Sequence, residues 1–128
     1  MNNRKQIDIL KEDNYEIDLI AAEVNAQSKT AFLEDLFLHF VNSYRLEGKI
    51  IPEIEISSGK PDELSRLHVT MSEETSYWIR VIAVRHYNLR MKLFMQSFIR
   101  WLAVEHRKSG RVWFDDTSVK VLPIRNRK

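Results

Sequence analysis

The sequence has no cysteine, and it has only three glycines and three prolines among 128 residues. Without cysteine the chain forms no disulfide and no thiolate metal site. The few glycines form no phosphate-binding loop, and no nucleophile motif is present. No apolar run is as long as a transmembrane helix, and the first residues lack the apolar core of a signal peptide. We therefore expect a cytoplasmic protein with no membrane partner.

Patterns typical of catalysis and metal binding are missing as well. The four histidines are scattered and form no pair with metal-ligand spacing. Asp115 and Asp116 are adjacent acids, but they fit the tip of a β-hairpin better than a catalytic pair. Glu105 and His106 fit the charged last turn of a helix. We expect no metal, no cofactor and no enzymatic activity, and an enzyme of unrecognised type is the weakest alternative.

What the sequence does contain is a repeated pattern. Apolar residues alternate over residues 4–10 and again over residues 65–71, as in a half-buried strand. Each run is followed by two amphipathic stretches with a polar break between them. The stretches are residues 15–24 and 29–46 in the first copy, and 75–84 and 89–104 in the second. A repeat of this kind predicts that the copies bury their apolar faces against each other.

The register of the repeat predicts the core. At an offset of sixty, Ile7 and Ile9 match Leu67 and Val69. In the helices an offset of sixty-one matches Ile17, Ile20 and Ala21 with Trp78, Val81 and Ile82, and Leu33, Phe37 and Val41 with Phe94, Phe98 and Leu102. These positions follow the spacing of a buried helical face. We expect Leu93, Phe94, Phe98 and Leu102 to pack against Leu33, Phe37 and Val41; the alternative is a chance likeness between two amphipathic hairpins.

The remaining segments divide the chain into four parts. We predict a first repeat over residues 1–48, a linker over 49–64, a second repeat over 65–108, and a hairpin with a basic tail over 109–128. The linker contains a short alternating run, Ile54-Glu-Ile56, that is compatible with a strand. The C-terminal hairpin is predicted from alternating runs at 111–114 and 119–122.

The small net charge of +2 conceals a polarity along the chain. Residues 1–48 hold five Lys and Arg against nine Asp and Glu, a net charge of −4. Residues 65–128 hold thirteen against five, a net charge of +8. A basic half suits a polyanionic partner, because each neutralised phosphate releases counterions. The alternative is that the basic half pairs with the acidic half inside one fold.

Several short motifs carry a resemblance to a known family. The second copy has the alternating strand Leu67–Met71, the helix start Ser72-Glu-Glu, and a second helix that opens near Asn88-Leu-Arg90. The first copy has Ile7-Asp-Ile9 and the helix start Ser28-Lys-Thr30. This order resembles ribbon-helix-helix DNA-binding proteins over about 90 of the 128 residues.

The resemblance implies a fold that is mostly α with short β. Two strand–helix–helix repeats would form an intrachain ribbon-helix-helix pseudo-dimer, followed by the C-terminal β-hairpin. We expect the two strand segments to pair antiparallel within one chain.

The resemblance also implies that the ribbon enters the major groove of DNA and that its outward side chains contact base edges. On the second copy these are Arg66, His68 and Thr70, and on the first copy Gln6 and Asp8, followed by Leu10. Arginine binds guanine as a fork, glutamine suits adenine, and threonine contacts a thymine methyl group. Asp8 can accept a hydrogen bond from cytosine, but its carboxylate is repelled by phosphate.

Phosphate contacts are implied at the start of each second helix, where free backbone N–H groups favour anions. The residues are Asn88, Arg90 and Lys92 in the second copy and Ser28 and Lys29 in the first. Asn88 and Ser28 are also good helix-capping residues. Capping alone is the better interpretation for Ser28.

The expected function is sequence-specific binding of double-stranded DNA without catalysis, as a transcriptional repressor or a plasmid or mobile-element accessory factor. Further expected partners are a second copy of the chain on DNA, or a protein bound through the acidic first repeat. The alternative is a helical protein–protein interaction module, adaptor or antitoxin-like, that does not bind DNA.

Overall fold

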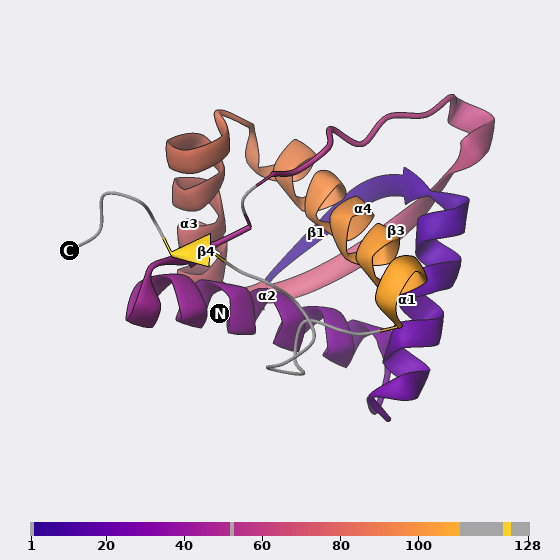
Figure 1. The fold of residues 1–128 in the computed structure, drawn as a ribbon, viewed down its shortest axis with the longest axis horizontal. Helices are drawn as coiled ribbons and strands as arrows, with labels where there is room; N and C mark the ends of the chain where they lie inside the picture. Colours follow the sequence, from indigo (N-terminus) through magenta and orange to yellow (C-terminus); the bar gives the residue numbers. More distant parts are fainter. Residues whose placement is uncertain (1, 52, 111–121, 124–128) are drawn as a thin grey trace.

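The computed structural model describes residues 2–51, 53–110 and 122–123. The described chain is mostly helical, with four α-helices and short antiparallel strands (Figure 1). The elements are β1 Asn2–Leu10, α1 Lys11–Glu23, α2 Lys29–Glu47, β2 Lys49–Ile50, β3 Leu64–Ser72, α3 Glu73–Ile82, α4 Met91–Ser109 and β4 Leu122–Pro123. A 3₁₀ turn, Pro61–Glu63, precedes β3, and a π-helical turn, Ala83–Tyr87, follows α3.

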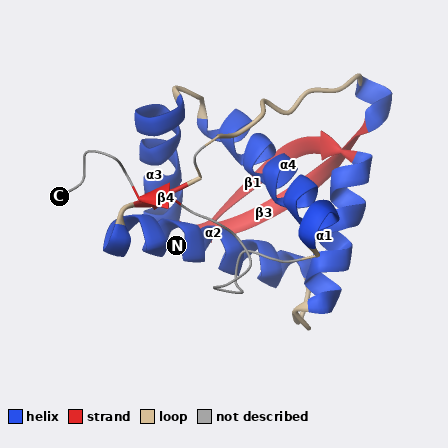
Figure 2. Cartoon of the chain, viewed as in Figure 1, coloured by secondary structure: helices blue, strands red, loops and turns tan. Residues whose placement is uncertain are grey.

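Strands β1 and β3 form a two-stranded antiparallel ribbon (Figure 2). The pairing runs from Asn2 opposite Ser72 to Leu10 opposite Leu64. The expectation that the two strand segments pair within one chain is confirmed. Successive side chains of a strand point to opposite faces, and one face of the ribbon is buried under the helices. Its residues are Ile7, Ile9, Leu67, Val69 and Met71.

The helices begin and end at residues whose chemistry suits helix termini. Ser28 Oγ accepts a hydrogen bond from the N–H of Ala31 at the start of α2, and Ser72 does the same for Thr75 in α3. Gly48 ends α2 with a φ of 68°, and Gly110 ends α4 with a φ of 70°. Glycine adopts this left-handed conformation without steric cost, so both helices stop where the sequence provides it.

The two strand–helix–helix halves of the chain are interlocked. Helix α2 packs against β3, and α4 packs against β1, so each longer helix covers the strand of the other half. The shorter helices follow the same rule, because α1 packs against α4 and α3 against α2 (Figure 1). Neither half therefore buries its apolar face by itself.

Aromatic rings from α2 and α4 fill the centre of the core. The ring of Phe98 lies 5.2 Å from that of Phe37 and 5.0 Å from that of Phe40. The ring centroid of Phe94 lies 5.8 Å from that of Phe40. The predicted contact between the two longer helices is confirmed for Phe98 with Phe37, and the other residues predicted to form it are buried, except that Leu93 is only half-buried.

The repeat has one constant spacing of 62 residues. Strands β1 and β3 start at Asn2 and Leu64, helices α1 and α3 at Lys11 and Glu73, and helices α2 and α4 at Lys29 and Met91. The buried faces follow the same spacing: residues 32, 33, 36, 37, 40, 41 and 44 of α2 correspond to residues 94, 95, 98, 99, 102, 103 and 106 of α4.

The predicted offsets of sixty and sixty-one are therefore wrong. Leu33 corresponds to Met95 rather than Phe94, and Ile17 corresponds to Ile79 rather than Trp78. Each longer helix buries pairs of adjacent residues, so a shift by one position still aligns apolar residues with one another. That degeneracy hid the true register.

Other predicted boundaries also change. Ile54–Ile56 is not a strand; the nearby Ser57 N–H donates to Ser97 Oγ at 3.0 Å and ties this segment to α4. Helix α4 runs over Met91–Ser109 rather than 89–104. Most of the predicted C-terminal hairpin, residues 111–121, lies outside the described residues. Its last residue, Leu122, pairs with Ile50 of β2.

Phe98 tests the core most directly. Its side chain is fully buried between two rings of α2, so we expect Phe98→Ala to lower the free energy of unfolding by about 3–5 kcal/mol. Leu38→Ala is the control, because Leu38 is 43% exposed on α2 and should cost less than about 1 kcal/mol. Equal losses in urea denaturation would contradict this packing.

Candidate nucleic-acid interface

The face of the ribbon turned away from the helices carries polar side chains. Gln6 and Asp8 of β1 are exposed, because they alternate with buried isoleucines. On β3, Arg66 is exposed, and His68 and Thr70 are half-buried. The structure thus brings all five predicted base-reading residues onto one face. In the register of the ribbon, Arg4 faces Thr70, Gln6 faces His68, and Asp8 faces Arg66.

This face has a local twofold relation. At the spacing of 62 residues Gln6 corresponds to His68, and these two residues face each other in the register. Two equivalent antiparallel strands are related by a twofold axis at the point where equivalent residues meet. Arg4 and Arg66 are therefore equivalent, two residues from the axis on either side.

Arg4 was missed from the sequence. The offset of sixty matched Arg66 with Gln6, which placed Arg4 outside the set of outward residues. A better signal was the pair of glycines after the longer helices, Gly48 and Gly110, which carry the true spacing.

Asp8 and Arg66 form an ion pair across the ribbon. Arg66 Nε lies 3.6 Å from Asp8 Oδ1, and both side chains are at least half exposed. An exposed pair of this kind contributes little to stability. Its effect is on the charge of the face, because a carboxylate lies beside one of the two equivalent arginines.

A hollow of about 450 Å³ adjoins the ribbon beside α4. It is lined by Arg4, Lys5, Gln6 and Lys92. Within residues 4–51 and 53–110, the cations Arg4, Lys5 and Lys92 form no ion pair. Helix α4 is held in place there by Gln96, whose Nε2 donates to the carbonyl of Asp8 at 2.9 Å. The hollow is therefore a fixed site with uncompensated positive charge.

The start of α4 differs from the sequence prediction. Asn88 does not cap this helix; it ends the π-helical turn with a φ of 56°. Asparagine tolerates the left-handed conformation that this turn requires. Arg90 occupies the N-cap position and makes no side-chain capping hydrogen bond. Arg90 and Lys92 are both exposed at this end of the helix.

The start of α2 is chemically different. Ser28 caps the helix through the N–H of Ala31, so the simpler interpretation of Ser28 as a cap is confirmed. Lys29 Nζ lies 3.1 Å from Asp18 and also donates a hydrogen bond to Asn14. The predicted phosphate-binding lysine of the first copy is thus already compensated by α1.

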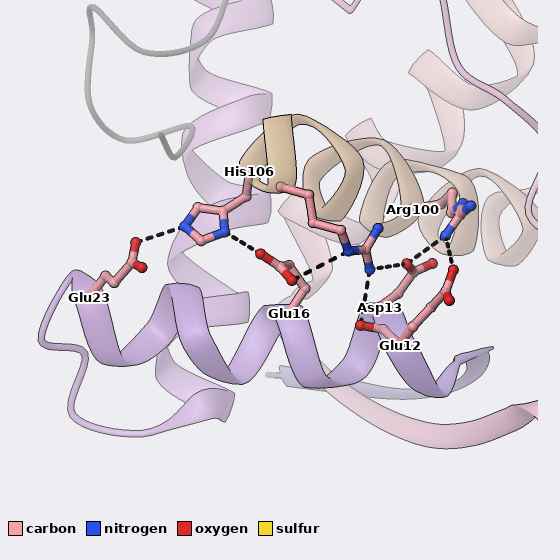
Figure 3. Close-up of polar contacts among 7 residues, drawn as sticks. Glu12, Asp13, Glu16, Glu23, Arg100 and His106 are labelled. Atoms are coloured by element: carbon pink, nitrogen blue, oxygen red, sulfur yellow. Dashed lines mark hydrogen bonds and ion pairs between the residues drawn. The ribbon is translucent and has the colours of Figure 1, made fainter. Parts of the chain in front are cut away.

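Helices α1 and α4 are joined by a network of charged side chains (Figure 3). Arg100 donates to Glu12 and Asp13, each at 2.8 Å. Arg107 donates to Asp13 at 3.2 Å. Burial raises the pKa of Asp13, and the hydrogen bonds and charges of the two arginines only partly offset this rise.

His106 of α4 lies between two glutamates of α1 (Figure 3). Its Nδ1 is 2.5 Å from Glu16 and its Nε2 is 2.7 Å from Glu23. Burial by itself lowers the pKa of His106, but the hydrogen bonds and charges of the glutamates outweigh it, and the net pKa is raised. The protonated ring can donate to both carboxylates, so the charged form suits this position.

The network accounts for part of the charge polarity of the sequence. Acidic residues of the first half and basic residues of the second half meet across the interface between α1 and α4. The interpretation that the two halves pair inside one fold therefore holds for Arg100 and Arg107. Within the part of the chain that the structure describes, it does not extend to Arg4, Lys5 and Lys92.

Helix α2 contacts α3 and the π-helical turn that follows it through fewer charged side chains. Tyr44 Oη lies 3.0 Å from His86 Nε2 and accepts a hydrogen bond from Arg85 at 3.0 Å. Burial, followed by the charge of Arg85, lowers the pKa of His86. Arg45 and Glu74 form an exposed ion pair at 2.8 Å. The two ends of the molecule are thus held by different chemistry.

Among the described residues, no group of three or more histidine or acidic side chains is arranged to hold a metal ion. No helix in the same part of the chain is long and apolar enough to cross a membrane. No protein-family model, curated protein or solved structure matches the sequence or fold of this chain. The site is therefore interpreted from its own geometry.

His106 predicts a pH dependence of stability. The pKa of His106 is raised in the folded state, so its protonation stabilises the fold at pH values below the unfolded pKa of about 6.5. This stabilisation is lost as the pH rises through the folded pKa. We expect the unfolding free energy of the wild-type protein to fall over this range, and that of His106→Gln to fall less. Identical pH profiles would mean that the ring is not charged between Glu16 and Glu23.

Proposed function

We propose that this chain is a single-chain ribbon-helix-helix protein that binds double-stranded DNA through the outward face of the β1–β3 ribbon. The supporting observation is the antiparallel pairing of β1 with β3, which sets Arg4 and Arg66 at equivalent outward positions. A two-stranded ribbon fits into the major groove, where each base pair has a distinct pattern of donors and acceptors.

The outward side chains suit base recognition. The guanidinium groups of Arg4 and Arg66 can each donate two hydrogen bonds to guanine O6 and N7. Gln6 can pair with adenine, and Thr70 can contact a thymine methyl group or form a hydrogen bond. These side chains lie on a pleated ribbon that packs against the core. A rigid ribbon favours specific base contacts more than a mobile ribbon would.

Because both strands belong to one chain, the DNA-binding face carries different side chains on its two halves. In order along each strand, Arg4, Gln6 and Asp8 correspond to Arg66, His68 and Thr70. The arginines match, but the other two positions differ between the strands. We infer that the preferred DNA site has a guanine contact on each side of its centre and is otherwise non-palindromic.

The cations beside the ribbon supply the phosphate contacts of this proposal. Arg90 and Lys92 are exposed at the start of α4, and the hollow next to them contains Lys5. Contacts of this kind position a protein on the duplex without reading its sequence. The biological role that fits such a protein is that of a transcriptional repressor or of an accessory factor of a plasmid or mobile element, with no catalytic step.

A second candidate function is supported by exposed apolar residues on the shorter helices. Tyr15 of α1 is 64% exposed and Tyr77 of α3 is 52% exposed, and the two residues are equivalent at the spacing of 62. Leu19 and Val84 are also exposed on or beside these helices. These surfaces favour a protein partner or self-association. They lie on helices rather than on the ribbon, so they are compatible with DNA binding.

Arg66 and Arg4 test base reading. We expect Arg66→Ala and Arg4→Ala each to remove the preference for one base pair, at about 1–3 kcal/mol. The preferred site is first selected from random duplexes, and affinities for its single-base variants are then measured by fluorescence anisotropy at two salt concentrations.

The matched control is Lys108→Ala. Lys108 is an exposed cation at the far end of α4, about 24 Å along the helix from Lys92. This variant should keep both the affinity and the base preference. Negligible binding of the wild-type protein at low salt, or an unchanged preference in both arginine variants, would reject the proposal in favour of the interaction module.

A further inference from the structure

The two ends of the ribbon are equivalent in position but unequal in charge. At one end lie the cations of the hollow and Arg90, and their equivalents at the other end follow from the spacing of 62 residues. Arg4 corresponds to Arg66, Lys5 to Leu67, Lys92 to Thr30, and Arg90 to Ser28. Only one of the four positively charged residues has a charged counterpart.

The charges that do exist at the second end are compensated. Arg66 is paired with Asp8 across the ribbon, at 3.6 Å. Lys29, at the start of α2, is 3.1 Å from Asp18. A phosphate that approached this end would meet two carboxylates beside two cations, and it would have to displace an existing partner.

Among the described residues, the cations of the first end have no such compensation. Arg4, Lys5 and Lys92 converge on one hollow of about 450 Å³, which is large enough for a phosphate group and its hydration. Lys92 lies one helical turn before Gln96, and the hydrogen bond of Gln96 to the backbone of β1 fixes the distance between helix and strand. The cations are thus set close together by the fold.

We propose that the protein holds the phosphate backbone of duplex DNA mainly at one end of its ribbon, through Lys5 and Lys92 of the hollow, beside the base-reading Arg4 and Gln6. Asp8 is the residue that weakens the other end, because it neutralises Arg66 and repels phosphate. This inference rests on the proposed DNA binding and adds a direction to it. The protein binds duplex DNA in one orientation, anchored on one flank of the site.

The salt dependence of binding measures this asymmetry. Each phosphate contact adds about one to the slope of log affinity against log salt. We expect Lys92→Gln and Lys5→Gln each to lower the slope by about one on a random-sequence 20-base-pair duplex. Two variants should leave the slope unchanged. Lys29→Gln changes the end whose cations are already paired, and Lys108→Gln is the control far from the ribbon.

Asp8→Asn gives a gain of function. Removal of the carboxylate frees Arg66 for its base and removes a charge that repels phosphate, so the affinity should increase. Asp62→Asn, a change at another exposed carboxylate, should have a smaller effect. Thermal unfolding of every variant confirms that the fold is retained, since all these side chains lie at the surface.

The outcomes separate the two proposals. If the wild-type protein does not bind duplex DNA, the proposed function itself fails. If it binds, but Lys29→Gln lowers the slope as much as Lys92→Gln, the two ends contribute equally and the one-sided anchor is wrong. An unchanged affinity in Asp8→Asn would likewise overturn the role given to Asp8.

Discussion

The antiparallel pairing of β1 with β3 is the constraint on which the rest of the structure depends. It brings together two strands separated by more than fifty residues, and it sets the helices of each half over the strand of the other half. The core therefore forms only when both halves are present. The same pairing places equivalent residues opposite each other at Gln6 and His68, which gives the outward face its local twofold relation.

The basic side chains of this protein serve two different purposes: some form ion pairs that hold helices together, and others line the hollow beside the ribbon. Arg100, Arg107 and His106 are used in the contact between α1 and α4, where they meet buried or half-buried carboxylates. The cations of the hollow have no such partners among the described residues. A net charge counted along the sequence cannot make this distinction, because it depends on which helix faces which.

Much of the fold could be predicted from the sequence, and the failures have a physical cause. Period-two and period-3.6 patterns indicated both strands of the ribbon and all four helices, and Ser28 marked the start of α2 as expected. The register was lost because adjacent buried residues on each helix tolerate a shift by one. The same error in register left Arg4 out of the predicted outward residues. The ion pair of Asp8 with Arg66 required the strand register, which no local pattern contains.

The most direct test of the central claim is an NMR titration of the ¹⁵N-labelled protein with its selected duplex. If the ribbon enters the groove, the amide shifts change at residues 4–8 and 66–70 and at the start of α4, near Arg90 and Lys92. The outer faces of α1 and α3, around Tyr15 and Tyr77, should change little. Changes confined to those helices, with an unaffected ribbon, would contradict DNA recognition by the β1–β3 ribbon.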